Sequence, residues 1–186
     1  MRTLAAHYFI SLDGVVDAPQ NWQFPYANPE VQAVVAAATE GVDALLMGRR
    51  TYEEWASFWP HQSGIALADF INGTQKYIAS TTVAHLDWER STLLRGDVVE
   101  AVADLKEQAG QRIAINGSAT LARTLLRAGL VDELHLLVHP VVVGAGKHLF
   151  QDGDGPVGLE LAEHKTFSNG VTYHVYRPAA LTTGRA

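Results

Sequence analysis

The sequence contains no cysteine among its 186 residues. A chain without thiols cannot form disulfides, hold zinc or an iron–sulfur cluster through cysteine, or use a cysteine nucleophile, so these chemistries are excluded. Proteins of reducing compartments have no use for disulfides, because thiols stay reduced there. We therefore expect a cytoplasmic protein.

Long apolar segments and an excess of basic residues are also missing. No apolar run approaches the roughly 20 residues that a membrane helix needs, and residues 1–8 have no features of a secretory signal. Aspartates and glutamates number 20 against 14 lysines and arginines, which gives a net charge of −6. Nucleic-acid-binding surfaces are usually basic, and no cluster of basic residues is long enough to form one. We therefore expect neither a membrane nor a nucleic acid as a partner.

Histidines are present, eight in number, but their spacing does not favour a metal site. His135 and His139 lie four residues apart on a strand-like segment, and four strand residues span about 13 Å. Ligands at about 2 Å from one ion cannot bridge that distance. Surface or core histidines are the better interpretation, and no metal is expected.

Strand-like and helix-like segments alternate over the first two thirds of the chain. Short apolar runs typical of buried strands occupy residues 3–10, 44–47, 76–79 and 112–115. Helical segments are predicted at 30–40, 51–58, 65–72, 97–109 and 119–128. Asn28 before Pro29, and Asp97 three residues before Glu100, are N-cap signals for two of these helices.

The last third of the chain is predicted to be β. Strands are expected at residues 133–143, 159–166 and 171–177, and the last two are joined by the hairpin signal Ser168-Asn169-Gly170. The whole pattern predicts one α/β domain over residues 1–178, with a disordered tail at 179–186. Its central sheet should be mostly parallel with helices on both faces, and the final hairpin should add antiparallel strands at one edge.

Two of the predicted strands run directly into glycine and polar residues and then into a helix. These segments are Gly48-Arg49-Arg50-Thr51 and Asn116-Gly117-Ser118-Ala119-Thr120. Ligands of open α/β sheets bind beyond the carboxyl ends of strands, where helix N-termini offer free N–H groups to phosphate. The arginines could grip a phosphate bidentately, although a solvated arginine pair and an ordinary strand–helix turn are the alternatives. Ser80 and Thr81, after a third strand, offer only hydroxyls.

Several segments, taken in order, resemble the dihydrofolate reductase-like superfamily. They are Ser11-Leu12-Asp13-Gly14, Leu46-Met47-Gly48-Arg49-Arg50-Thr51-Tyr52-Glu53, Ile115-Asn116-Gly117-Ser118, and Pro140-Val141-Val142-Val143-Gly144-Ala145-Gly146 with Phe150. The chain up to about residue 178 is most similar to the branch that includes the reductase domain of bacterial bifunctional riboflavin-biosynthesis proteins. The resemblance implies the three-layer dihydrofolate reductase-like fold and NADPH as cofactor.

By this resemblance, four parts of the chain would bind NADPH. Gly48, Arg49, Arg50 and Thr51 would hold the adenosine 2′-phosphate and its neighbouring phosphate, and Ser80 and Thr81 would lie near the adenosine ribose. Asn116, Gly117, Ser118, Ala119 and Thr120 would cradle the pyrophosphate. The backbone near Phe9 and Val16 would face the nicotinamide.

The implied reaction is hydride transfer from NADPH to a small planar heterocycle or carbonyl. The aromatic residues Trp22, Phe24, Tyr52 and Trp55 are candidates to stack on such a substrate, unless they fill the core instead. Asp13 is the catalytic candidate, because it could anchor substrate or relay a proton. An Asp-Gly turn, with the carboxylate capping nearby N–H groups, is the alternative.

Departures from the family pattern bear on the substrate. The acid that folate reductases carry in the first long helix falls at Gln32, and Glu30 lies about 200° around the helix from it, so folate reduction is not expected. The deaminase domain of the riboflavin proteins is absent from the chain. A reductase of 5-amino-6-(5-phosphoribosylamino)uracil, a stand-alone reductase and a non-catalytic NADP(H)-binding protein all remain open. A homodimer is also expected, because residues 133–143 and the β-rich C-terminus could pair across a two-fold axis, as relatives often do.

Overall fold

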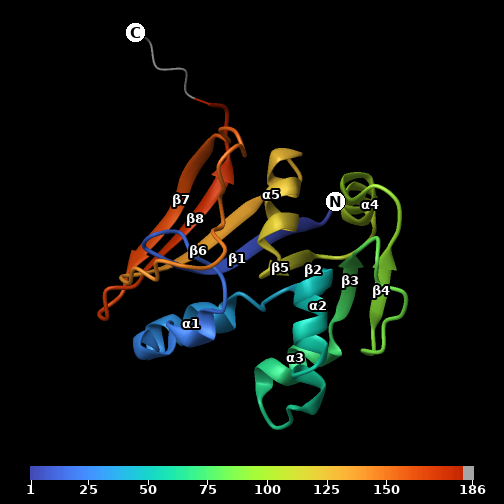
Figure 1. Ribbon diagram of the computed structural model, residues 1–186, viewed down its shortest axis with the longest axis horizontal. Helices are drawn as coiled ribbons and strands as arrows, with labels where there is room; N and C mark the ends of the chain where they lie inside the picture. The colour runs from blue at the N-terminus through green and yellow to red at the C-terminus, as the bar shows by residue number, and fades with distance from the viewer. Residues whose placement is uncertain (182–186) are drawn as a thin grey trace.

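A computed structural model describes residues 1–181, which form an eight-stranded sheet flanked by helices (Figure 1). The strands are β1 (Thr3–Ser11), β2 (Val42–Gly48), β3 (Gln75–Ala79), β4 (Ser91–Leu94), β5 (Arg112–Asn116), β6 (Glu133–His139), β7 (Leu159–Thr166) and β8 (Thr172–Pro178). The helices are α1 (Pro29–Ala37), α2 (Arg49–Ala56), α3 (Ala66–Gly73), α4 (Val98–Glu107) and α5 (Ala119–Arg127), with short 3₁₀ turns η1 (Pro19–Asn21), η2 (Phe24–Tyr26) and η3 (Trp59–His61).

In space the strands follow the order β4-β3-β2-β5-β1-β6-β8-β7. Strands β1 to β6 run parallel, and β8 is antiparallel to both of its neighbours, β6 and β7. The β7–β8 hairpin turns at Gly170, whose φ of +84° suits glycine. The predicted mostly parallel sheet with an antiparallel C-terminal pair is therefore confirmed.

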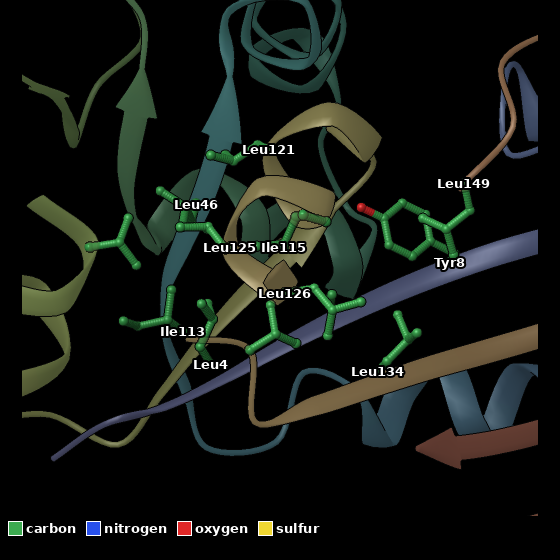
Figure 2. Packing of buried hydrophobic residues seen from close by; sticks show 14 of the residues in the cluster. Leu4, Tyr8, Leu46, Ile113, Ile115, Leu121, Leu125, Leu126, Leu134 and Leu149 are labelled. Carbon is green, nitrogen blue, oxygen red and sulfur yellow. The ribbon is translucent and has the colours of Figure 1, made fainter. Parts of the chain in front are cut away.

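Helices cover both faces of this sheet, α4 and α5 on one and α1, α2 and α3 on the other (Figure 1). Alternate residues of each strand point to opposite faces. On the α4–α5 side, Leu125 of α5 packs with Leu4 and Ile113 of the sheet, and all three are fully buried (Figure 2). On the other side, α2 and α3 cover β2 and β3, while α1 packs over β6 and β8.

The predicted helix starts are confirmed by their caps. The Asn28 side chain accepts a hydrogen bond from the Val31 N–H (2.8 Å), and Asp97 accepts from the Val99 and Glu100 N–H groups. Helix α1 ends at Ala37, before the predicted limit of residue 40. The chain then turns toward Gly41, whose φ is +68°.

Three strand predictions need correction. The strand expected at 133–143 ends at His139, because Pro140 has no N–H to donate to a neighbouring strand. It lies between β1 and β8, so neither of its edges can pair across a two-fold axis, and the edge strand on the C-terminal side of the sheet is β7. Strand β4 was not predicted, because its four residues are partly exposed at the other edge and lack a strong apolar pattern.

The C-terminal segment was expected to be a disordered tail over residues 179–186. Residues 179–181 have no regular structure, but the Ala179 N–H donates to the Gly158 carbonyl at 2.9 Å. Residues 182–186 lie outside the described part of the chain. None of the helices within residues 1–181 has the length and apolar character needed to cross a membrane.

Candidate functional site

The two glycine-containing segments singled out in the sequence meet at neighbouring strand ends. Strands β2 and β5 are adjacent and parallel, so their carboxyl ends lie at the same edge of the sheet. Helix α2 leaves β2 toward one face, and α5 leaves β5 toward the other. Such a divergence of helices creates a crevice at the strand ends, which is the usual ligand position in open α/β sheets.

Hydrogen bonds join the two helix starts across this crevice. The Gly48 N–H donates to the Ser118 Oγ at 2.9 Å, and that hydroxyl donates to the Thr51 Oγ1 at 2.7 Å. The Ser118 N–H also donates to the Thr51 Oγ1, at 3.1 Å. Gly48 and Thr51, at the start of α2, are thus joined to Ser118, about 70 residues away, and the first turn of α2 is fixed against the first turn of α5.

Backbone conformation at Gly117 and Ser118 makes this junction compact. Gly117 has a φ of +69°, and a Cβ there would lie 3.4 Å from the Thr51 side chain. Ser118 also lies in the left-handed region, with φ 53° and ψ 44°. A non-glycine residue in that region costs on the order of 1 kcal/mol or more and persists only where its surroundings hold it, often at a functional site.

Tyr8 is a residue of this junction that the sequence did not reveal. Its hydroxyl donates to the Gly117 carbonyl at 2.6 Å, and the ring lies at the edge of the core with its hydroxyl turned toward α5 (Figure 2). Burial raises the pKa of Tyr8 well above its ordinary value, so the hydroxyl keeps its proton. One feature of the sequence could have pointed to Tyr8. It is the single tyrosine among the core-facing residues of β1, and the others, Leu4, Ala6 and Ile10, are aliphatic.

Replacing Tyr8 by phenylalanine should loosen the junction. The Gly117 carbonyl would lose its donor, which we expect to lower the free energy of unfolding by about 1–2 kcal/mol. Thermal melting measures this loss. Tyr77→Phe is the matched control, because Tyr77 packs against the same core and no hydrogen bond from its hydroxyl is found within residues 1–181. Equal effects of the two variants would contradict a specific role of the Tyr8 hydroxyl.

Arg49 and Arg50 lie in the first turn of α2, and each forms an ion pair with the glutamate four residues further along the helix. Arg49 contacts Glu53 at 3.0 Å, and Arg50 contacts Glu54 at 3.8 Å. The arginine side chains are 48% and 60% exposed. Exposed pairs of this kind contribute only about 0–1 kcal/mol, so each guanidinium can turn toward an incoming anion at little cost.

The other predicted phosphate- and ribose-binding residues also lie at these strand ends. Asn116 ends β5, and Ala119 and Thr120 form the first turn of α5. Ser80 and Thr81 follow β3, whose last residue pairs with Gly48. The Ser80 hydroxyl accepts from the Thr82 and Val83 N–H groups, both at 3.1 Å, and so stabilises its own turn.

Phe9 and Val16, expected near the nicotinamide, belong to β1 and the loop that follows it. His7 pairs with Asn116, so Phe9 lies two residues further toward the same edge of the sheet. The Phe9 side chain packs on the α1 side. The Val16 N–H donates to the Lys147 carbonyl at 2.9 Å, which ties this loop to residues 140–149.

The Asp13 carboxylate anchors the loop after β6. It accepts hydrogen bonds from the Ser11 hydroxyl (2.6 Å), the Val143 N–H (3.1 Å) and the Gly144 N–H (2.8 Å). These bonds lower the pKa of Asp13 to about 2. The carboxylate therefore caps N–H groups of a distant loop rather than those of its own turn, which the sequence had suggested, and it is ionised at neutral pH.

Comparing Asp13→Asn with the wild type at several pH values should show how much the Asp13 carboxylate contributes to stability. Because the folded-state pKa lies below the usual value of about 3.9, the carboxylate contributes stability above pH 4 that is lost as the pH falls toward 2. The variant should melt below the wild type at pH 7, and the difference should shrink toward pH 2. Asp104→Asn, at an exposed position on α4, is the control. A difference that stays constant over this range would contradict the assigned contacts.

The four aromatic substrate candidates do not come together at one surface. Tyr52 is 5% exposed and its hydroxyl accepts from the Trp88 N–H, so it fills the core beneath α2, the alternative considered above. Trp55 packs partly in the same cluster. Trp22 is also buried, and its indole N–H donates to the Asp17 carbonyl. Phe24 is 63% exposed and remains accessible to a ligand.

Helix α1 offers no free acid at the position that folate reductases use. Glu30 accepts hydrogen bonds from the Ser168 N–H (3.0 Å), the Ser168 hydroxyl and the Asn28 side chain. These contacts lower its pKa and bind the start of α1 to the C-terminal hairpin. Gln32 is exposed. Within residues 1–181, no three histidines, aspartates or glutamates come together in a way that could hold a metal ion.

The strand order, the two helical layers and the antiparallel hairpin define a dihydrofolate reductase-like α/β protein, as predicted. The chain belongs to the family of the RibD C-terminal domain, whose profile matches residues 2–173. It is 29% identical over 179 residues to YyaP, an uncharacterized protein of Bacillus subtilis (strain 168), with 94% of each chain covered.

Two solved structures show the same fold. A putative riboflavin biosynthesis protein from Shewanella sp. PV-4 superposes with a TM-score of 0.79 at 22% identity, over 96% of this chain and 99% of that one. Dihydrofolate reductase from Enterococcus faecalis, solved in complex with NADP(H), gives a TM-score of 0.63 at 16% identity, over 96% and 97% of the two chains. The recognition made from the sequence motifs is confirmed at the level of family and fold.

Proposed function

We propose that this protein is an NADPH-dependent reductase that transfers hydride to a small planar heterocycle or carbonyl. The observation that carries the proposal is the junction of Gly48, Thr51 and Ser118, which places two helix N-termini and two exposed arginines around one crevice. The solved dihydrofolate reductase complex with NADP(H) supports it by analogy of fold.

The residues at the crevice fit a dinucleotide carrying a 2′-phosphate. Gly117 is exposed, and a side chain there would press on Thr51, so only glycine leaves this approach open. The first N–H groups of α2 and α5 have no partner within their helices and would bind the pyrophosphate. Arg49 and Arg50 would hold the 2′-phosphate with charge-assisted hydrogen bonds.

When bound, NADPH supplies the hydride, and the chain's own residues bind and orient it. Asp13 holds residues 143 and 144 beside the end of β1, so it would position the wall of the nicotinamide site while remaining ionised. Asp13→Asn should therefore lower turnover more than NADPH affinity. Equal turnover in the variant would remove Asp13 from the mechanism.

A non-catalytic NADP(H)-binding protein is the second candidate. The observation that favours it concerns Asp13 and Glu30, the two acids considered for catalysis. The carboxylate oxygens of both already accept hydrogen bonds from the protein, so neither acid is free to act on a substrate. A substrate screen with NADPH-loaded protein separates the two functions. Oxidation of NADPH by any planar heterocycle or carbonyl supports the reductase, and binding without turnover across the screen supports the second candidate. A riboflavin-pathway pyrimidine belongs in that screen because of the Shewanella relative.

Tryptophan fluorescence tests cofactor binding directly, with NADPH and NADH titrated separately into the purified protein. Tight binding of NADPH and weak binding of NADH supports the proposed function. No binding of either dinucleotide overturns both candidates, because both depend on the same crevice.

We also propose that two copies of the chain associate through the open edge of β7. This strand is the sheet's last, and nearly all of its residues are exposed, including Leu161 at 50%. Exposed edge strands readily pair with another strand. Light scattering should give the mass of a dimer, and Leu161→Lys should convert it to a monomer. A monomeric wild type would contradict the pairing.

A further inference from the structure

A cavity of about 370 Å³, open to solvent on the side of β7, lies between α1 and the sheet, away from the crevice described above. Its roof is formed by the small side chains Val34, Ala37 and Ala38, at the C-terminal end of α1. Its floor is formed by β5, β6, β8 and β7. Cavities of this size are large enough for a small organic molecule.

The floor of this cavity is polar, although it belongs to a sheet face that a helix covers. On β6, Leu134 and Leu136 face the core on the α5 side, so Glu133 and His135 face α1. The phenol of Tyr173, on β8, lies beside His135. A layer between helix and sheet is normally filled by large apolar side chains. Here small residues on the helix and polar residues on the strands leave space that a ligand can fill.

Hydrogen bonds order the polar groups in the floor. The Tyr173 hydroxyl and the His135 Nδ1 are 2.7 Å apart, and the His135 Nε2 and Glu133 carboxylate are 3.2 Å apart. Burial lowers the pKa of His135, so the ring is neutral at pH 7. A neutral ring donates from Nε2 to Glu133 and accepts the Tyr173 hydroxyl proton at Nδ1.

Basic groups outnumber acidic ones around the cavity. The Glu133 carboxylate forms ion pairs with both Arg177 and Arg112, whose guanidinium nitrogens lie 3.0 Å and 3.9 Å from its oxygens. Lys165 pairs with Glu163 at 2.7 Å. One carboxylate cannot neutralise two guanidinium groups, so one positive charge is left in excess at the cavity, in a protein whose net charge is −6.

We propose that this cavity binds a small organic acid whose carboxylate pairs with the guanidinium N–H groups of Arg112 and Arg177 that Glu133 does not use. A single excess positive charge matches a singly charged anion, and guanidinium groups bind carboxylates through paired hydrogen bonds. Val34, Ala37 and Val175 contact the apolar body of the ligand.

The site is separate from the proposed cofactor crevice. Arg112 and Glu133 are the first residues of β5 and β6, whereas Asn116 and Ser118 lie at the opposite end of β5. Asn116 lies four positions along the strand from Arg112, a span of about 13 Å. The inference does not depend on NADPH binding, and each site can be tested while the other is empty or full.

Benzoate is a suitable probe, because it joins one carboxylate to an apolar ring. We expect a saturable titration of the ring signals of His135 in NMR spectra of the full-length protein. Benzyl alcohol, which has the same ring without the charge, should bind at least tenfold more weakly. Inorganic phosphate should not compete with benzoate, except at concentrations high enough to screen the charges of the protein as any salt does. Binding of phosphate in preference to benzoate would overturn the assignment to a carboxylate.

Two variants test the place of binding by different means. Arg112→Gln should weaken benzoate at least tenfold, and Ala37→Trp should abolish its binding by filling the cavity from the exposed side of α1 without changing a charge. Arg127→Gln, at the end of α5 on the other face of the sheet, is the matched control and should bind as the wild type does. Circular dichroism of each variant reports whether it is folded, and NADPH titration reports whether the crevice is unaffected.

The proposal is overturned if benzoate binding survives in both Arg112→Gln and Ala37→Trp, or if the His135 signals do not respond. It is also overturned if benzoate competes with NADPH, because the probe would then lie in the crevice. A protein that binds benzoate but not NADPH would sustain this inference while removing the proposed function.

Discussion

Replacing Arg49 and Arg50 together by alanine should weaken NADPH binding on the order of 100-fold and leave NADH binding nearly unchanged. Charge-assisted hydrogen bonds are worth about 1.5–3 kcal/mol each, and every 1.4 kcal/mol is about tenfold in affinity. NADH lacks the 2′-phosphate that these side chains would hold. The dissociation constant of NADH divided by that of NADPH, both measured by fluorescence, should therefore fall in the double variant.

Glu53→Gln and Glu54→Gln form the matched control for that experiment. These carboxylates pair with Arg49 and Arg50 in the ligand-free structure. Removing them frees the arginines, so NADPH should bind equally well or up to severalfold tighter, within the roughly 1 kcal/mol that an exposed pair contributes. Equal losses for NADPH and NADH in the arginine variant would contradict the assignment of a 2′-phosphate site.

Lys76→Met should destabilise the protein by about 3 kcal/mol, because it removes a buried ammonium that binds three carbonyls. Lys76 is fully buried, and its Nζ donates to the carbonyls of Ile71 (3.1 Å), Asn72 (3.1 Å) and Thr74 (2.7 Å) at the end of α3. It also lies 4.5 Å from the centre of a Trp88 ring. A loss of this size should lower the melting temperature by roughly 6–12 °C.

The pH dependence of stability gives a second test of Lys76. Burial, and then the charge of Arg90, lower its pKa to about 8, whereas an unfolded lysine titrates near 10.4. Between these values the unfolded chain binds more protons, so the Lys76 contribution makes unfolding less favourable as the pH rises from 8 to about 10. Lys76→Met should lack this rise. Lys165→Met, at an exposed lysine, is the control, and similar effects of both variants would contradict the account.

Much of the fold could be predicted because local signals agreed with one another. Asn28 and Asp97 cap the helices that they were expected to cap, and Gly170 turns the C-terminal hairpin. Strand β4 escaped prediction because an edge strand with partial exposure needs little apolar pattern. The limit of β6 was misplaced because the β-branched residues after Pro140 look like strand, although the proline ends the pairing.

The candidate site was predictable in its segments but not in its contacts. Gly48 and Ser118 were identified by their position after apolar runs, whereas their hydrogen bond joins residues 70 positions apart. Tyr8 was missed for the same reason, since its partner Gly117 is 109 residues away. The polar floor beneath α1 also could not be foreseen, because it requires β6 and β8 to be neighbours on one face.

Backbone NMR spectra recorded during an NADPH titration test the central claim most directly. We predict that the amide signals of Gly48, Gly117 and Ser118 shift with the same dissociation constant as the tryptophan fluorescence. Signals at the far end of the sheet, such as Arg112 and Glu133, should stay in place. Saturable shifts at that far end, or none at Gly48, Gly117 and Ser118, would contradict the assignment of the cofactor to this crevice.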